Sequence, residues 1–130
     1  MTRRPREQYL SLYNEIDITL DPFPYNGHTT SIDSLWMGVP VVTLSGDRAV
    51  SRGGVSLLSN LRLTEWIAAT EQDYVERAVS FANDSARLVG LRQNLRDRLR
   101  RSPVMDERGF IAKLENAYRS AWRTWCTSIA

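Results

Sequence analysis

The sequence predicts an α/β fold in three layers, with a small parallel sheet of about three strands and helices towards the C-terminus. The clearest sign is Asp17–Leu44, where a short strand, a stiff loop, a helix and a second strand follow one another. The second strand, Val39–Leu44, is apolar on both faces, as strands of parallel sheets are. A third sign is the helical spacing of apolar residues from Thr70 onward.

The first half of the chain divides into elements that follow from local residue patterns. Arg6–Asn14 is expected to be a helix with one apolar side, and Ile16–Leu20 a short buried strand. Two prolines and a glycine exclude helix and strand from Asp21–Gly27, which is therefore a shaped loop. A short helix is expected to open at His28 and to close at Gly38.

After the second strand, Ala49–Leu61 has the apolar spacing of a helix. Gly53 and Gly54 inside it would each cost about 1 kcal/mol relative to alanine, so they are expected to permit a close approach to the sheet or to a ligand. Glu65–Ala68 is expected to be a third, short strand.

Three helices are predicted for the remainder of the chain. Thr70 begins the first with a capping-box-like start, and its expected core face is Val75, Ala78, Val79 and Ala82. The second has leucines at helical spacing, namely Leu88, Leu91, Leu95 and Leu99. The arginines on its opposite side are expected to form a solvated face. Asp106 can cap the last helix, in which Trp122 and Trp125 are expected to be packing residues.

Composition limits the classes of function that need consideration. With 130 residues, a single domain over residues 1–130 is expected, without a membrane span or a signal peptide. The only cysteine, Cys126, excludes an internal disulfide, and with one histidine a catalytic zinc centre is not expected. A net charge of +2 is too small to indicate nucleic-acid binding. These features fit a cytoplasmic protein that binds neither nucleic acid nor membrane.

The start of the helix after Gly27 has the chemistry of a nucleotide site. A helix N-terminus carries unpaired N–H groups and a positive dipole end, and Thr29, Thr30 and Ser31 add hydroxyl donors suited to phosphate. Asp33 shares their side of the helix and suits a sugar hydroxyl, which can donate to a carboxylate. Phosphate donors beside a ribose acceptor describe half of a nucleotide site. Taken alone, the hydroxyls and Asp33 could equally be ordinary helix-capping residues.

Two stretches of the chain carry a specific family pattern, which Ser51-Arg52 and Glu65–Ala68 extend. They read Leu20-Asp-Pro-Phe-Pro-Tyr-Asn-Gly-His-Thr-Thr30 and Asp33-Ser-Leu-Trp-Met-Gly-Val-Pro-Val-Val-Thr-Leu44. This pattern closely resembles the O-linked N-acetylglucosamine transferase and SPINDLY family, in its bacterial tetratricopeptide-linked branch. The resemblance runs from about Glu7 to about Trp125.

The resemblance implies a GT-B glycosyltransferase, in which two Rossmann-like domains face each other across a cleft. Such enzymes invert the configuration at the anomeric carbon of the sugar and require no metal. They move N-acetylglucosamine from UDP to a protein Ser or Thr hydroxyl. By this resemblance Thr29 and Thr30 bind the donor diphosphate, with Gly27 at the turn before them. His28 would border the diphosphate and Asp33 would take the ribose hydroxyls. No cofactor is implied beyond the nucleotide-sugar substrate, UDP-GlcNAc.

The chain also departs from that family. It is expected to be only the second half of the C-terminal catalytic domain, without the strands that bring a phosphate-contacting lysine and without the N-terminal domain. Tyr9 aligns near the histidine that stacks on uracil in animal relatives, and Arg6 is the basic residue nearest the base. We therefore expect the isolated chain to be inactive, as a truncated or split enzyme.

Two function classes remain open from the sequence. One is the donor-binding portion of a glycosyltransferase, whose catalytic residues cannot be assigned from this chain. The alternative is a non-catalytic nucleotide-binding or oligomerising remnant, since a three-stranded sheet would leave an edge that recruits partners. A homo-oligomer or a missing-domain partner is expected in either case. The sugar, the base and the acceptor protein are not determined by the sequence.

Overall fold

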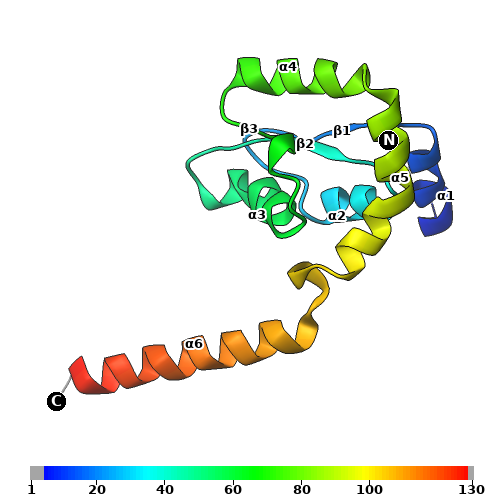
Figure 1. Ribbon diagram of the computed structural model, residues 1–130. Helices are drawn as coiled ribbons and strands as arrows, with labels where there is room; N and C mark the ends of the chain where they lie inside the picture. The colour runs from blue at the N-terminus through cyan, green and yellow to red at the C-terminus, as the bar shows by residue number, and fades with distance from the viewer. Residues whose placement is uncertain (1–4, 129–130) are drawn as a thin grey trace.

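The computed structural model describes residues 5–128 (Figure 1). The α-helices are α1 (Arg6–Ser11), α2 (Thr29–Trp36), α3 (Gly53–Asn60), α4 (Glu71–Ala82), α5 (Ser85–Arg100) and α6 (Glu107–Ser128). The strands are β1 (Thr19–Leu20), β2 (Val41–Leu44) and β3 (Ile67–Ala68). Short 3-10 turns complete the order: η1 (Leu12–Asn14), η2 (Ala49–Ser51), η3 (Thr64–Trp66) and η4 (Pro103–Met105).

The three strands form one parallel sheet in the order β1-β2-β3. Thr19 pairs with Val41, and Thr43 pairs with Ile67, so β2 is the central strand. Helix α4 covers one face of this sheet, while α2 and α3 cover the other (Figure 1). The predicted three-layer α/β fold with a small parallel sheet is therefore confirmed.

The first and third strands are shorter than predicted. Only Thr19 and Leu20 of the expected strand Ile16–Leu20 are paired, and Ile16 and Leu20 are exposed, so the expectation of a buried strand is wrong. Thr19 N–H donates to the carbonyl of Pro40 at 2.9 Å, but proline has no N–H to donate in return, so the ladder cannot extend back along β1. In the expected strand Glu65–Ala68, a 3-10 turn precedes the two paired residues of β3.

The predicted helix Ala49–Leu61 begins later than expected. Its first residues form the 3-10 turn η2, and the regular helix α3 starts at Gly53. A Cβ atom on Gly54 would lie 2.2 Å from Thr43 Oγ1 and 2.5 Å from Asp21 Oδ2. Gly54 thus permits the start of α3 to approach the sheet closely, as predicted for the glycine pair, whereas a Cβ atom on Gly53 would meet His28.

The core lies around β2, where all four strand residues are buried. Its other fully buried side chains come from helices on both sides of the sheet and include Leu35, Leu58, Trp66, Leu95 and Leu99. Helix α2 is closed by Gly38, which lies two residues after the last helical residue and has a φ of +83°, a left-handed conformation that favours glycine. Val39 N–H donates to the carbonyl of Ser34 and Gly38 N–H to that of Leu35, which completes a Schellman motif. The predicted end of this helix is confirmed.

The predicted core face of α4 is right only for Ala78. Val75, Val79 and Ala82 are exposed, and Tyr74 and Phe81 pack towards the core beside Ala78. Phe81 stacks on Trp66 with ring centroids 3.9 Å apart. Helix α4 has apolar residues on two of its sides. Their spacing alone does not show which side packs against Trp66 of η3.

The arginines of α5 are not simply a solvated face. Arg92 donates to the carbonyl of Tyr13 at 2.8 Å and to that of Ile16 at 3.2 Å. Arg96 donates to the carbonyl of Trp36 at 2.7 Å and lies over the ring of the same residue. These two side chains fasten α5 to the N-terminal segment and to the end of α2.

Helix α6 extends away from the rest of the fold (Figure 1). None of its described residues is buried, so Trp122 and Trp125, which were expected to be packing residues, are exposed within residues 5–128. The two indoles instead stack on each other, with ring centroids 5.2 Å apart. Among the helices that the structure describes, none is long and apolar enough to cross a membrane.

Candidate functional site

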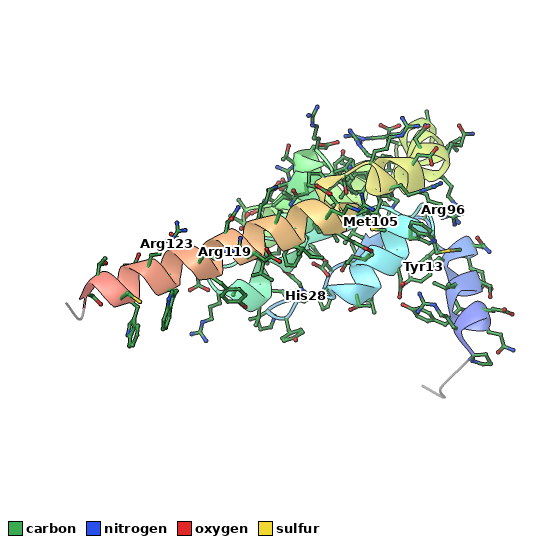
Figure 2. All side chains as sticks on the ribbon, turned by 90° about the horizontal axis from the view of Figure 1, so that it is seen from below. Tyr13, His28, Arg96, Met105, Arg119 and Arg123 are labelled. Carbon is green, nitrogen blue, oxygen red and sulfur yellow. The ribbon has the colours of Figure 1, made fainter. Side chains whose placement is uncertain are left out.

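The loop after β1 and the start of α2 lie at the carboxyl ends of the parallel strands, where open α/β sheets bind ligands. His28 precedes the helix with a φ of +45°, a left-handed conformation that non-glycine residues rarely adopt. This conformation turns the chain sharply from the loop into α2. Figure 2 labels His28 and Tyr13 on either side of that helix.

The first turn of α2 has backbone donors available. Within residues 5–128, the amides of His28, Thr29 and Ser31 have no hydrogen-bond acceptor. Thr30 differs, because its N–H and its hydroxyl both donate to the carbonyl of Gly27, at 3.1 and 3.0 Å. An anion at this helix start would thus meet open amides and the positive end of the helix dipole.

The three hydroxyls at this helix start have different environments. Thr29 is exposed, whereas Ser31 is buried and donates its hydroxyl to Asp21 Oδ1 at 2.9 Å. The hydroxyl-rich start was expected to serve phosphate as a group. In this structure only Thr29 keeps a hydroxyl that no described residue engages.

Asp33 lies one turn into the helix, on the side of Thr29 and Thr30. Its carboxylate is 3.5 Å from Arg6 Nη2, with side chains that are 15% and 74% exposed respectively. An ion pair with such an exposed arginine contributes little to stability. The fold therefore brings Arg6 and Asp33 together. Another hydrogen-bond donor could take the place of Arg6 beside the carboxylate.

Tyr9 reaches the same helix start through a second tyrosine. Its hydroxyl is 2.7 Å from the hydroxyl of Tyr13, which in turn donates to the carbonyl of Thr30 at 3.3 Å. The rings meet edge to face, with centroids 5.6 Å apart. Burial, followed by the hydrogen bond with Tyr9, raises the pKa of Tyr13 far above its usual value. Tyr13 was expected only as part of an apolar helix side, and its link to Thr30 was missed.

His28 is held from two sides at the helix start. Its ring lies against Gly53 at the start of α3, where a Cβ atom would fall 2.4 Å from Cε1. Tyr25 meets the ring edge to face, with centroids 5.8 Å apart. The imidazole is exposed, so it borders the open amides without covering them.

Two buried polar residues of the loop were not recognised in the sequence as part of the site. Asp21 accepts three hydrogen bonds, from Gly27 N–H, Ser31 Oγ and Thr43 Oγ1. Asn26 accepts from Gly54 N–H at 3.1 Å. A polar residue directly after a predicted strand was the available signal for Asp21, because such residues lie at the ligand-binding edge of the sheet.

The described residues contain no group of three or more His, Cys, Asp or Glu side chains that could hold a metal ion. A separate groove of about 640 Å³ lies at the opposite, amino end of β1. Its lining includes Asp17, Ile18, Leu88, Val89 and Arg92. The groove is thus at the wrong end of the strand for the helix donors.

Comparison with known proteins gives a consistent picture. The model of the family described as glycosyl transferase family 41 matches residues 4–114. A probable UDP-N-acetylglucosamine–peptide N-acetylglucosaminyltransferase SPINDLY of Petunia hybrida is 43% identical over 118 residues, which are 91% of this chain and 13% of that protein. The UDP-N-acetylglucosamine–peptide N-acetylglucosaminyltransferase of Caenorhabditis elegans is 30% identical over 120 residues, or 92% of this chain and 10% of that protein.

A solved structure agrees in fold as well as in sequence. A mutant O-GlcNAc transferase of Thermobaculum terrenum superposes with a TM-score of 0.89 at 42% sequence identity, covering 100% of this chain and 25% of that one. The predicted resemblance to the O-GlcNAc transferase and SPINDLY family, in its C-terminal catalytic region, is therefore confirmed. The chain spans only a small part of these relatives.

Proposed function

Because the chain belongs to glycosyl transferase family 41, we propose that it forms the donor-binding portion of an inverting glycosyltransferase. The sugar would be N-acetylglucosamine, moved from UDP to a Ser or Thr hydroxyl of a protein. The names of the relatives support this donor and this class of acceptor. The proposed setting is the cytoplasm, where the single Cys126 would stay reduced.

The observation that carries the proposal is the set of open amides at the start of α2. The exposed residues His28 and Thr29 present N–H groups without an acceptor among the described residues, at the carboxyl ends of β1 and β2. The N–H of Ser31 also lacks an acceptor there but belongs to a buried residue. A diphosphate has the negative charge and the acceptor oxygens that these donors require. As the sugar is transferred, charge develops on the departing diphosphate, and preorganised donors would stabilise it.

The neighbouring side chains suit the rest of a nucleotide. Asp33 would accept hydrogen bonds from the ribose hydroxyls, with the exposed Arg6 moving aside towards solvent. Tyr9 would offer a ring on which the base can stack. Because α2 supplies the positive potential, binding would need no divalent metal.

Thr30 would have to change partners to contact the donor through its side chain. Its hydroxyl now donates to Gly27, and a rotation about χ1 would free it. The neighbouring exposed hydroxyl of Thr29 needs no such change. We therefore assign Thr29 the more direct side-chain contact with the diphosphate and Thr30 a smaller one.

A nucleotide titration tests the proposal directly. UDP and GDP would be added in turn to isotope-labelled chain, and the backbone amide signals of residues 27–33 followed with and without Mg²⁺. The proposal predicts shifts concentrated at His28, Thr29 and Ser31, with the same affinity in both metal conditions. If millimolar UDP moved none of these signals, the donor site would be refuted for this chain.

A second candidate function rests on a different observation. Helix α6 exposes a row of large apolar side chains and buries none of its described residues. The row consists of Phe110, Ile111, Leu114, Tyr118, Trp122 and Trp125. Exposed apolar stripes of this size mark interaction surfaces, which favours an oligomerising module. Nucleotide binding without association supports the first candidate, and association without nucleotide binding supports the second.

A further inference from the structure

Asp21 is a buried carboxylate directly behind the proposed diphosphate site. It is 2% exposed, and its two oxygens accept three hydrogen bonds. Oδ1 accepts from Gly27 N–H at 2.8 Å and from Ser31 Oγ at 2.9 Å, while Oδ2 accepts from Thr43 Oγ1 at 2.8 Å. These donors belong to the loop, to α2 and to β2, so one side chain joins three elements.

No cation compensates this charge. Among the ion pairs of residues 5–128, none includes Asp21. A buried carboxylate without a counter-ion is costly unless strong hydrogen bonds satisfy it. The three donors and the nearby start of α2 are therefore what keeps Asp21 inside the fold.

The main chain of Asp21 is fixed as well. Its N–H donates to the carbonyl of Val42 at 2.9 Å, which continues the pairing of β1 with β2. Its carbonyl accepts from the hydroxyl of Tyr74 on α4 at 3.0 Å. The backbone of Asp21 is thus held by β2 and by α4, so its carboxylate can act as a rigid anchor for the loop.

The two bonds to Oδ1 bracket the proposed donors. One is made by Gly27, before His28, and the other by Ser31, after Thr30. Because Asp21 is bonded to both ends of this turn, it fixes the backbone conformation that orients the N–H groups of His28 and Thr29. A Cβ atom on Gly27 would lie 3.2 Å from Asp21 Oδ1 and closer still to the hydroxyls of Thr30 and Ser31, so the bracket also requires the glycine.

We infer that Asp21 is a positioning residue for the donor diphosphate: it does not touch the ligand but holds the Gly27–Ser31 turn in the conformation that presents the amides. This inference rests on the proposed function. Preorganised donors bind and stabilise an anion without the cost of ordering a loop at that moment. A carboxylate suits this task because it is an acceptor for all three donors at once.

A merely structural role would have different consequences. In that case Asp21 would support the core through Thr43 as much as through the turn, and removing any partner would lower stability without changing nucleotide affinity. Ser31→Ala and Thr43→Val form a matched pair, since each removes one hydroxyl from the same carboxylate. Only Ser31→Ala removes one of the two hydrogen bonds that hold the turn around the amides of His28 and Thr29.

The experiment measures UDP affinity by amide chemical shifts in the full chain, at a temperature below the unfolding transition of each variant. We expect Asp21→Ala to weaken UDP binding about tenfold, Ser31→Ala about threefold, and Thr43→Val by less than about twofold. Asp21→Asn should restore most of the affinity, because its Oδ1 can keep Gly27 and Ser31 while Nδ2 donates to the rotated Thr43 hydroxyl. Asp17→Ala, an exposed carboxylate at the other end of β1, should change nothing.

Hydrogen exchange of the Gly27 amide gives a second readout. It should be protected in the wild type and in Asp21→Asn, and unprotected in Asp21→Ala. If wild-type chain does not bind UDP, the proposed function fails and the inference fails with it. If wild-type chain binds but Ser31→Ala and Thr43→Val bind equally well, only the inference is overturned. The Ser31 and Thr43 pair decides the matter even if Asp21→Ala does not fold.

Discussion

The imidazole ring of His28 lies against the α-carbon of Gly53, so that a Cβ atom there would fall 2.4 Å from Cε1 and 2.7 Å from Nδ1. Gly53→Ala should therefore displace His28 from the start of α2. Because the imidazole is exposed and can rotate away, the free energy of unfolding should change little, which a denaturant titration can check. UDP binding should weaken in the same variant.

Gly90→Ala is the matched control for that substitution. Gly90 also lies in a helix, but a Cβ atom there would have no heavy atom within 4 Å. Alanine should raise stability by about 1 kcal/mol through helix propensity alone. If Gly53→Ala behaved like Gly90→Ala, with unchanged nucleotide affinity, the contact between His28 and Gly53 would have no part in the site.

Asp33→Ala should weaken UDP binding by about tenfold or more, because a hydrogen bond to a charged group contributes about 1.5–3 kcal/mol. Thr29→Ala should have a smaller effect, since the backbone donors remain. Thr30→Ala should have the smallest, because its hydroxyl is directed at Gly27. Calorimetry or amide shifts would rank the three variants, and an unchanged affinity for Asp33→Ala would remove the ribose role.

The chain by itself should transfer no sugar to any protein. The chain matches 25% of the Thermobaculum terrenum enzyme, and catalysis depends on holding both reactants in the right geometry. A radiolabelled UDP-GlcNAc assay with purified chain and a peptide acceptor checks this. Turnover that disappears with Asp33→Ala would contradict the expectation and would imply a self-sufficient site.

Trp122 and Trp125 should mediate self-association through the exposed face of α6. Light scattering at increasing protein concentration should report a dimer or larger assembly. Replacing both indoles with serine should return the chain to a monomer, while Thr124→Ala, between them, should leave the assembly intact. A wild-type chain that stays monomeric at high concentration would count against the oligomerising surface.

Stability should fall in alkaline solution because of Tyr13. Burial raises its pKa in the folded chain, so the unfolded chain loses the phenolic proton first. The stabilisation is complete below the unfolded pKa of about 10 and is lost as pH rises beyond it. Thermal melts across this range should show a shallower loss for Tyr13→Phe. Burial raises the pKa of Tyr74 as well, so part of the dependence should persist.

The sequence was sufficient for features that local chemistry determines. The loop between β1 and α2 follows from Pro22, Pro24 and Gly27, and the end of α2 follows from Gly38, whose conformation disfavours any side chain. The apolar run of β2 predicted a strand buried on both faces. The helix start was recognised from the same local information, although the roles of its residues stay predictions.

Features that depend on distant partners were beyond the sequence. Val75 and Val79 were placed in the core because their spacing fits a helix face, but the aromatic pair of Trp66 and Phe81 selects the other face of α4. The use of the Ser31 hydroxyl by Asp21 was equally hidden, because it depends on how the loop folds back over the strand. Spacing along one element does not determine which neighbour that element meets.

Arg92 joins residues that are far apart along the chain, since its bonds to the carbonyls of Tyr13 and Ile16 span 79 and 76 positions. A nascent chain leaving the ribosome must therefore release α5 before the segment that carries Tyr9 can be fastened in place. Until then the carbonyl of Tyr13 lacks its hydrogen bond from Arg92. The segment around the proposed nucleotide site should therefore become ordered only after α5 has been synthesised, although it precedes α5 along the chain.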